Sequence, residues 1–231
     1  MPVVAVSAWV VSLIIKVVDM MQRYNLISFL LLTLILPVSA GAQTQTWCGD
    51  PPRRLAQGSA WDYTKPEHQL RVRSIERVHF TDDVRALRRG STGYLIQDIE
   101  FMLNSIPNHY QALDALARLA VREGTEQPRM ANMSVECRFH WARQVNSRDA
   151  MVPLIHGLYF FRQGNHDEAR QHFELAASLD SNNPEVQYNL GLVLFRLGDY
   201  TAARNHARRA YSLGYPLPGL RKLLAEAGYP L

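Results

Sequence analysis

The fold is decided by a stretch that repeats itself, AMVPLIHGLYFFRQGNHDEARQHFELAASLDSNN at residues 150–183 and PEVQYNLGLVLFRLGDYTAARNHARRAYSLGY at residues 184–215. Small residues recur at a fixed spacing of 34 between the two copies. The matched pairs are Gly157 with Gly191, Gly164 with Gly198, Ala169 with Ala203, and Ala176 with Ala210. Four pairs at one spacing indicate a single structural unit used twice in succession.

Each copy is predicted to form two amphipathic helices joined by a glycine turn, because apolar residues recur three and four positions apart. The predicted helices are 154–162, 166–179, 186–197 and 200–213. Gly164 and Gly198 follow the first helix of each pair, where a positive φ is favoured. Pro184 is expected to start the next helix. One such pair cannot bury its apolar face alone, so about three pairs are needed for stability.

This pattern resembles the tetratricopeptide repeat family in its period, in the Leu190-Gly191 pair and in the Ala169-x3-Phe173 spacing. The resemblance implies an all-α solenoid of helix–turn–helix units, in which Gly157 and Ala169 let the paired helices approach closely. The repeats are expected at 150–183 and 184–216.

Degenerate copies extend the resemblance toward the N-terminus, so that the whole array is predicted to cover residues 91–216. Residues 94–103 match a lone second helix, and residues 110–122 and 134–144 match a full pair. The turn of that pair holds six extra residues, because Gly124 lies 18 positions before Ala142 where the later copy has 12.

Capping segments are predicted at both ends of the array, because an open stack of repeats needs polar ends. Residues 217–231 supply a last helix at 217–228, with Arg221, Lys222 and Glu226 on its outer side.

Residues 43–90 are rich in Pro, Gly, Asp and Arg and are predicted to be an irregular cap on the first helices of the array. Trp47, Trp61 and Tyr63 are its scattered anchors. Asp82 and Asp83 mark the start of a short helix. A separate domain of this size would be marginally stable.

Residues 1–42 form a predicted leader. Arg23, the apolar run 26–36 and the small residues 40–42 have the order of a secretory signal peptide cleaved before Gln43. Residues 1–20 are also apolar, and we hypothesise that translation starts at Met20 or Met21. The alternative is an uncleaved anchor that holds the chain at a membrane, facing the periplasm.

Export makes the cysteines informative, because the chain has only two, Cys48 and Cys137. An even pair in an oxidising compartment favours a disulfide. Such a bond would hold the N-terminal segment on the array and contribute about 2–4 kcal/mol. The alternative is two separate thiols, with Cys137 buried on its helix.

Composition argues against several classes of function. The 25 Lys and Arg against 21 Asp and Glu give a net charge of +4, which permits an acidic partner but does not indicate nucleic-acid binding. The chain has no Gly-x-Ser-x-Gly, Walker or His-Glu-x-x-His motif. His166 and His172 are six apart and do not share a helix face. We therefore predict no enzyme activity, no cofactor and no metal site.

The family resemblance implies a concave groove lined by the first helix of each pair. Carried onto this sequence, its peptide-binding lining would include Arg118, Arg122, Leu158, Phe161, Arg162, Tyr188, Asn189, Leu192, Phe195 and Arg196. Arg122, Arg162 and Arg196 occupy one repeat position, and arginines beside aromatics suit a peptide with acidic groups or a free carboxylate. The alternative is that these arginines are only solvated helix ends.

Asn189 matches an Asn that some family members use against a peptide backbone, but the lysines of that clamp are absent. The resulting prediction is an exported, non-enzymatic adaptor or scaffold of the bacterial cell envelope, located in the periplasm, that binds a protein or peptide. One alternative is a membrane-tethered subunit of an envelope assembly complex. Another is an enzyme or metal carrier hidden in residues 43–90.

Overall fold

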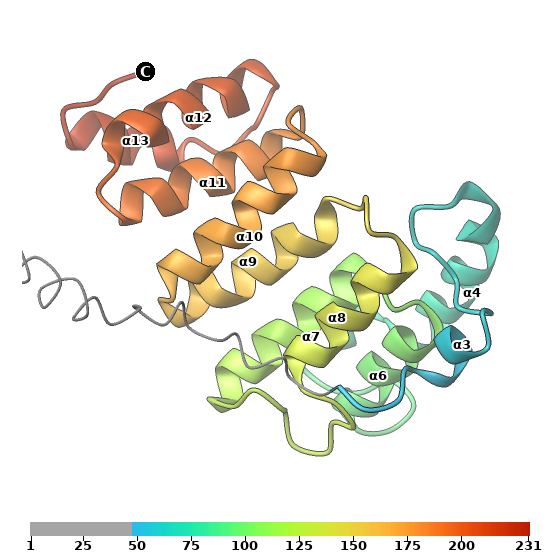
Figure 1. The fold of residues 1–231 in the computed structure, drawn as a ribbon. Helices are drawn as coiled ribbons and strands as arrows, with labels where there is room; N and C mark the ends of the chain where they lie inside the picture. Colours follow the sequence, from blue (N-terminus) through green and yellow to red (C-terminus); the bar gives the residue numbers. More distant parts are fainter. Residues whose placement is uncertain (1–47) are drawn as a thin grey trace, which may run out of the picture. The chain divides into compact units, whose positions relative to one another are not determined.

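A computed structural model of the chain describes residues 48–231, so the predicted leader and the anchor Trp47 lie outside the described residues. All regular secondary structure in the described part is helical, with no strand, which confirms the predicted all-α fold (Figure 1). Its helices are α3 Arg53–Ala56, η1 Pro66–His68, α4 Gln69–His79, α5 Asp82–Arg85, α6 Leu95–Ser105, α7 Tyr110–Glu123, α8 Val135–Val145, α9 Met151–Gln163, α10 His166–Leu179, α11 Pro184–Arg196, α12 Tyr200–Ser212 and α13 Gly219–Glu226. Within residues 48–231, no helix combines the length and hydropathy that a membrane span requires.

The predicted repeats are the helical pairs α9–α10 and α11–α12. Helix α10 has the predicted bounds, whereas α9 and α11 start three and two residues before the predicted positions. Capping groups explain the earlier starts: Asp149 accepts a hydrogen bond from the Met151 amide, and Asn183 accepts one from the Glu185 amide. Pro184 occupies the first turn of α11, as predicted.

The small residues of the repeat stand where the two helices of a pair come into contact. A Cβ atom on Gly157 would lie 2.5 Å from the Phe173 ring and 3.2 Å from the Ala169 carbonyl oxygen. The second repeat reproduces the close approach, since a Cβ on Gly191 would lie 3.2 Å from the Ala203 carbonyl oxygen. The turn glycine Gly164 has a φ of +84°, the left-handed conformation expected after the first helix.

Helices α6, α7 and α8 correspond to the degenerate copies and precede the regular repeats along the array (Figure 1). The longer turn between α7 and α8 is fixed to α6, because the buried Glu100 of α6 accepts a hydrogen bond from the Asn132 amide in this turn. The same carboxylate forms a buried ion pair with Arg138 of α8, at 3.0 Å. Arg138 also donates to Asn104 of α6, at 2.7 Å.

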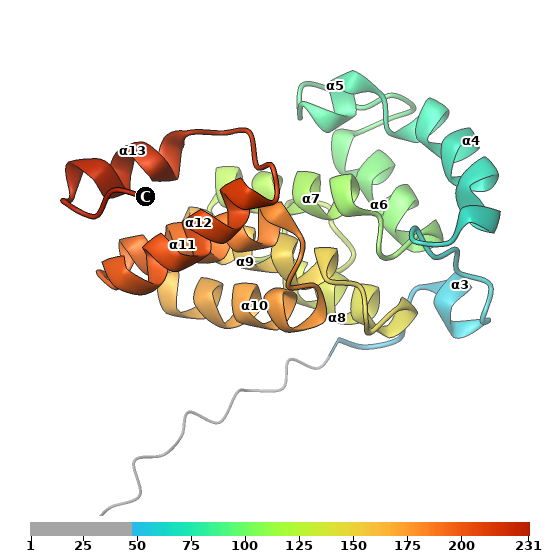
Figure 2. The ribbon, with the colours of Figure 1, turned by 90° about the horizontal axis from the view of Figure 1, so that it is seen from above.

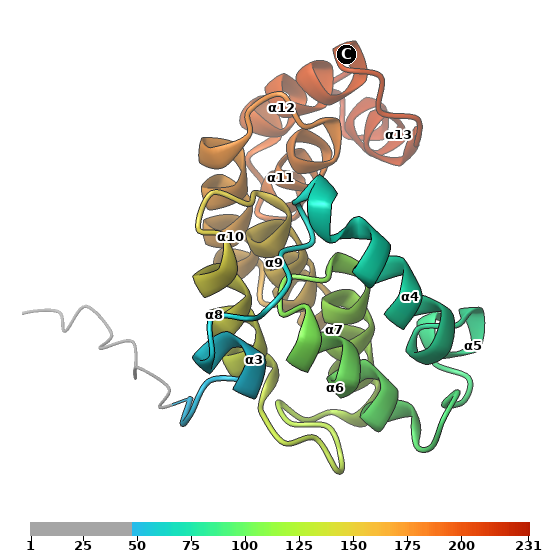
Figure 3. The same ribbon diagram turned by 90° about the vertical axis from the view of Figure 1, so that its right-hand side faces the viewer.

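The N-terminal segment is more regular than predicted, because it contains the 11-residue helix α4. Val72 turns inward from α4 and is buried, and Glu76 contacts His109, with 2.9 Å between Oε1 and Nε2. Figure 3 shows α4 beside α6. The short helix α5 starts at Asp82, as predicted. The segment therefore packs on the first helices of the array.

The predicted disulfide between Cys48 and Cys137 is present and joins the start of the described chain to α8. At the other end, α13 packs against α11 and α12. Its Leu220 is buried and lies against Gly191, while Arg221, Lys222 and Glu226 are exposed, as predicted for a cap.

Candidate functional site: the concave face of the array

Helices α7, α9 and α11, each the first helix of its pair, lie side by side and form one face of the array. Asp114 of α7 forms an ion pair with Arg162 of α9, at 2.8 Å between Oδ1 and Nη2. Burial raises the pKa of the Glu185 carboxyl on α11, and the charge of Asp114 raises it further. This is the face that the family resemblance predicts to be concave, and it is called the concave face below. In Figure 2, α5 and α13 lie on the side of these helices opposite α8 and α10.

The α7 part of this face is covered by the chain itself. The Arg118 guanidinium donates a hydrogen bond to the carbonyl of Arg85 at 2.7 Å, and Arg122 donates to the carbonyl of Leu87 at 2.9 Å. Carbonyls at a helix end lack partners within the helix and attract cations. Arg118 and Arg122, which the sequence predicts to line the groove, instead both donate to carbonyls at the end of α5.

The α9 and α11 parts of the face are more open. Leu158 and Phe161 on α9 are half-buried, and so are Leu192 and Phe195, the residues one repeat later on α11. On each helix the two side chains are three positions apart and share a face. Arg196 follows them, is exposed, and has no ion-pair partner within residues 48–231.

Tyr188 and Asn189 are buried and engaged with the protein itself. The Tyr188 hydroxyl accepts a hydrogen bond from the Leu220 amide at 3.3 Å, and its ring stacks on Tyr215 at 4.1 Å between centroids. The Asn189 amide donates to the Glu185 carbonyl of its own helix, at 2.9 Å. Tyr188 therefore attaches the C-terminal cap, a role that sequence spacing does not indicate.

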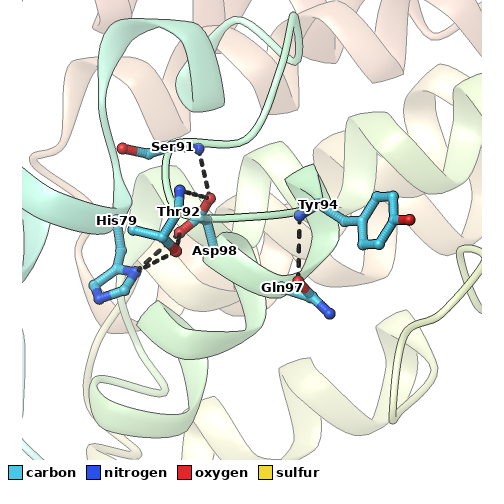
Figure 4. Close-up of polar contacts among 6 residues, drawn as sticks. All are labelled: His79, Ser91, Thr92, Tyr94, Gln97 and Asp98. Atoms are coloured by element: carbon cyan, nitrogen blue, oxygen red, sulfur yellow. Dashed lines mark hydrogen bonds and ion pairs between the residues drawn. The ribbon is translucent and has the colours of Figure 1, made fainter.

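A polar cluster lies at the start of α6 (Figure 4). The buried Asp98 carboxylate accepts hydrogen bonds from the Ser91 amide, from the Thr92 amide and hydroxyl, and from His79 Nδ1, which lies 2.9 Å from Oδ1. Burial alone would raise the pKa of Asp98, but the hydrogen bonds from Thr92 and His79 lower it. The cluster fixes the loop before α6, and His79 stacks on Phe101.

Histidines of the repeats take part in aromatic packing. The rings of His156 and His172 have centroids 3.9 Å apart, and His166 packs beside Phe161. Burial, with a smaller effect from His156, lowers the pKa of His172 to about 3, so that its imidazole is neutral at pH 7. Across residues 48–231, no three His, Cys, Asp or Glu side chains are grouped as metal ligands.

Residues 157–205, which run from α9 into α12, match the family model described as TPR repeat. Comparison with curated proteins finds no match. Several solved structures are similar, and two are described here. One, from a functional characterization of Pseudomonas aeruginosa pilF, is 19% identical, with 70% of this chain and 68% of that chain covered and a TM-score of 0.49. The other is TTC0263, a thermophilic TPR protein of Thermus thermophilus, at 19% identity, 69% and 98% coverage and a TM-score of 0.36.

Proposed function

We propose that this chain, a tetratricopeptide-repeat protein, is a non-enzymatic adaptor that binds a protein or peptide on the concave faces of α9 and α11. Repeat arrays of this kind present extended concave surfaces to their partners. The partner would contact α9 and α11 rather than α7, because α5 already covers the face of α7.

The observation that carries the proposal is the repetition of one motif on α9 and α11, which consists of two half-buried apolar residues and an exposed arginine. Leu158, Phe161 and Arg162 on the first helix correspond to Leu192, Phe195 and Arg196 on the second. A partner segment with apolar side chains and acidic groups would contact both the apolar surface and the guanidinium groups. Arg196 has the larger role in this proposal, because Arg162 already shares the carboxylate of Asp114.

Export to the cell envelope belongs to the same proposal. The leader pattern in residues 21–42 supports it, and so does a disulfide, which persists in an oxidising compartment. The alternative is a membrane-tethered subunit of an envelope assembly complex, which would use residues 1–42 as an anchor. Release of the native protein from the envelope without detergent would favour the soluble adaptor over this alternative.

The experiment is affinity capture from cell envelopes with the C-terminally tagged protein, followed by affinity measurement with the purified partner. Arg196→Glu should weaken binding by roughly tenfold or more, because an attractive charge becomes repulsive. Arg208→Glu is the matched control, since Arg208 is exposed on α12. Circular dichroism checks that both variants stay helical. Equal affinity of Arg196→Glu and the control would show that the partner binds elsewhere.

A further inference from the structure

Helix α4 has an exposed face that takes no part in the proposed binding surface of α9 and α11. In Figure 2, α4 lies at the edge of the array, beyond α6 and α7. The inner side of α4 packs on the array, because Val72 is buried and Glu76 contacts His109. The outer side of the helix is exposed along its length, and its composition indicates what it contacts.

The outer face of α4 is basic. Arg71, Arg73 and Arg77 are exposed, and none of them forms an ion pair within residues 48–231. The acidic residue of this helix, Glu76, is engaged with His109 instead. Arg73 and Arg77 are four positions apart, and like charges at this spacing repel each other on a helix. The face is thus complementary to a partner of negative charge.

Large apolar side chains stand among these arginines. Leu70 and Val78 are 73% and 47% exposed, and their spacing of eight positions places them on one side of the helix. Phe101 of α6 is 44% exposed and stacks on His79 at the end of α4, with 3.9 Å between the ring centroids. Exposed apolar side chains that are grouped and rimmed by charged residues are typical of a surface that contacts a protein or a membrane.

We propose that the outer face of α4 lies on an anionic lipid surface. Leu70 and Val78 would enter the headgroup boundary, while the neighbouring arginines bind lipid phosphates, as in amphipathic helices that lie in the plane of a bilayer. Arginine suits this position, because its apolar stem can be buried while its guanidinium reaches a phosphate.

The mixed composition of the face favours a bilayer over other partners. An anionic bilayer offers phosphate and hydrocarbon side by side, so it satisfies the arginines and the exposed apolar residues together, whereas an acidic protein segment offers mainly the charge. A second copy of the chain fits less well, because a symmetric contact through this face would place arginines against arginines.

The test is co-sedimentation of the purified protein with vesicles of phosphatidylglycerol and with vesicles of phosphatidylcholine. Binding to the anionic vesicles should be roughly tenfold tighter or more, and it should weaken as salt is added, because salt screens exposed charges. Equal binding to both kinds of vesicle, or binding to neither, would overturn the proposal. Calorimetric titration with a poly-glutamate peptide is the second probe. Saturable binding of this peptide without a preference for anionic vesicles would identify an acidic protein segment as the partner and would also overturn the proposal.

Charge variants then assign the binding to α4. Arg73→Gln combined with Arg77→Gln should weaken binding to the anionic vesicles by roughly tenfold or more, because each arginine close to an anionic surface contributes to the attraction. Arg208→Gln combined with Lys222→Gln is the matched control, since it removes two exposed positive charges from α12 and α13. The two double variants have the same net charge, so an equal loss of binding would overturn the assignment to α4.

An apolar variant tests the other half of the contact. Leu70→Gln should weaken vesicle binding by roughly threefold to tenfold, because less apolar surface enters the headgroup boundary. Leu217→Gln is the matched control, because Leu217 is also exposed but follows α12. Equal binding of the Leu70 and Leu217 variants would show that Leu70 does not contact lipid.

A fluorescent label separates contact through α4 from contact through residues 1–42. Ser74→Cys places an environment-sensitive dye between Leu70 and Val78, and the native cysteines do not react because they are joined in the disulfide. Ser178→Cys on α10 is the matched control, since each serine is exposed and donates to the carbonyl three positions earlier. Anionic vesicles should shift the emission of the Ser74 label to shorter wavelength and leave the Ser178 label unchanged. No shift at Ser74, or equal shifts at both positions, would show that α4 does not lie on the lipid.

Discussion

The regular repeats α9–α12 and the chain before them bury different kinds of side chain. In the repeats, the buried polar residues are His156, Gln187 and Asn189. Among described residues before α9, the buried polar and charged residues are Asp62, Asp98, Glu100, Ser105, Asn108, His109, Arg138 and Asp149. The repeats are thus stabilised mainly by close packing of small and apolar residues. The degenerate half depends on specific polar contacts.

One hydrogen-bond network shows how polar contacts join the segments of the degenerate half, where the small residues of the regular repeats are missing. The Asn108 amide donates to Asp62 at 2.8 Å and to Asp149 at 3.3 Å, and the Tyr110 hydroxyl donates to Asp149 at 3.0 Å. Burial raises the pKa of the Asp149 carboxyl, while these hydrogen bonds lower it. The network joins the N-terminal segment to α7 and to the start of α9. Removing one member would take a hydrogen bond from a buried carboxylate, which costs stability.

The largest effect is expected for Arg138→Ala in the degenerate half. This variant leaves the Glu100 carboxylate buried without its counter-ion, which costs about 3–5 kcal/mol of unfolding free energy. Urea denaturation followed by circular dichroism measures the loss. Arg143→Ala is the control, because Arg143 is exposed on the same helix and its loss should cost less than about 0.5 kcal/mol. Equal costs for the two variants would mean that the buried pair does not stabilise this half.

The disulfide is the second way to weaken the degenerate half. Cys48→Ala with Cys137→Ala should lower the unfolding free energy by about 2–4 kcal/mol, because the bond joins residues 89 positions apart. Thermal unfolding with and without a reducing agent measures the effect. Reductant should destabilise the wild type and leave the double variant unchanged. A wild type that is indifferent to reductant would show that the bond adds no stability.

A smaller effect is expected in the regular half from Gly157→Ala. The added methyl group would lie 2.5 Å from the Phe173 ring, and overpacking of this kind costs about 1–3 kcal/mol. Gly191→Ala is the matched comparison. Its methyl group would lie 2.9 Å from the end of the Leu220 side chain on α13, which can move more easily than a ring in the core. Urea denaturation should show the larger loss for Gly157→Ala, and equal losses would indicate that α13 is held as rigidly as the repeat.

The sequence predicted the repeats well because their period, their turn glycines and Pro184 are local signals. Helix α4 was missed, since few of its residues are apolar and only Val72 is fully buried. The sequence could not predict that α5 covers the α7 part of the groove. Arg118 and Arg122 bind carbonyls that lie 33 and 35 positions earlier in the chain, and no periodic pattern links positions so far apart. The six extra residues before α8 were visible in the sequence, but their spacing does not reveal that Glu100 of α6 holds this turn. The leader prediction concerns residues outside the described part of the chain.

The coverage of α7 by α5 bears on the length of the partner proposed above. The open part of the concave face is left to α9 and α11, with α5 and α13 beside it (Figure 2). Packed helices have axes about 8–10 Å apart, so two of them span about 20 Å. An extended chain advances about 3.3 Å per residue, so a segment that crosses both helices is about six residues long. Under the proposed function, the partner would therefore be a short linear motif rather than a folded domain.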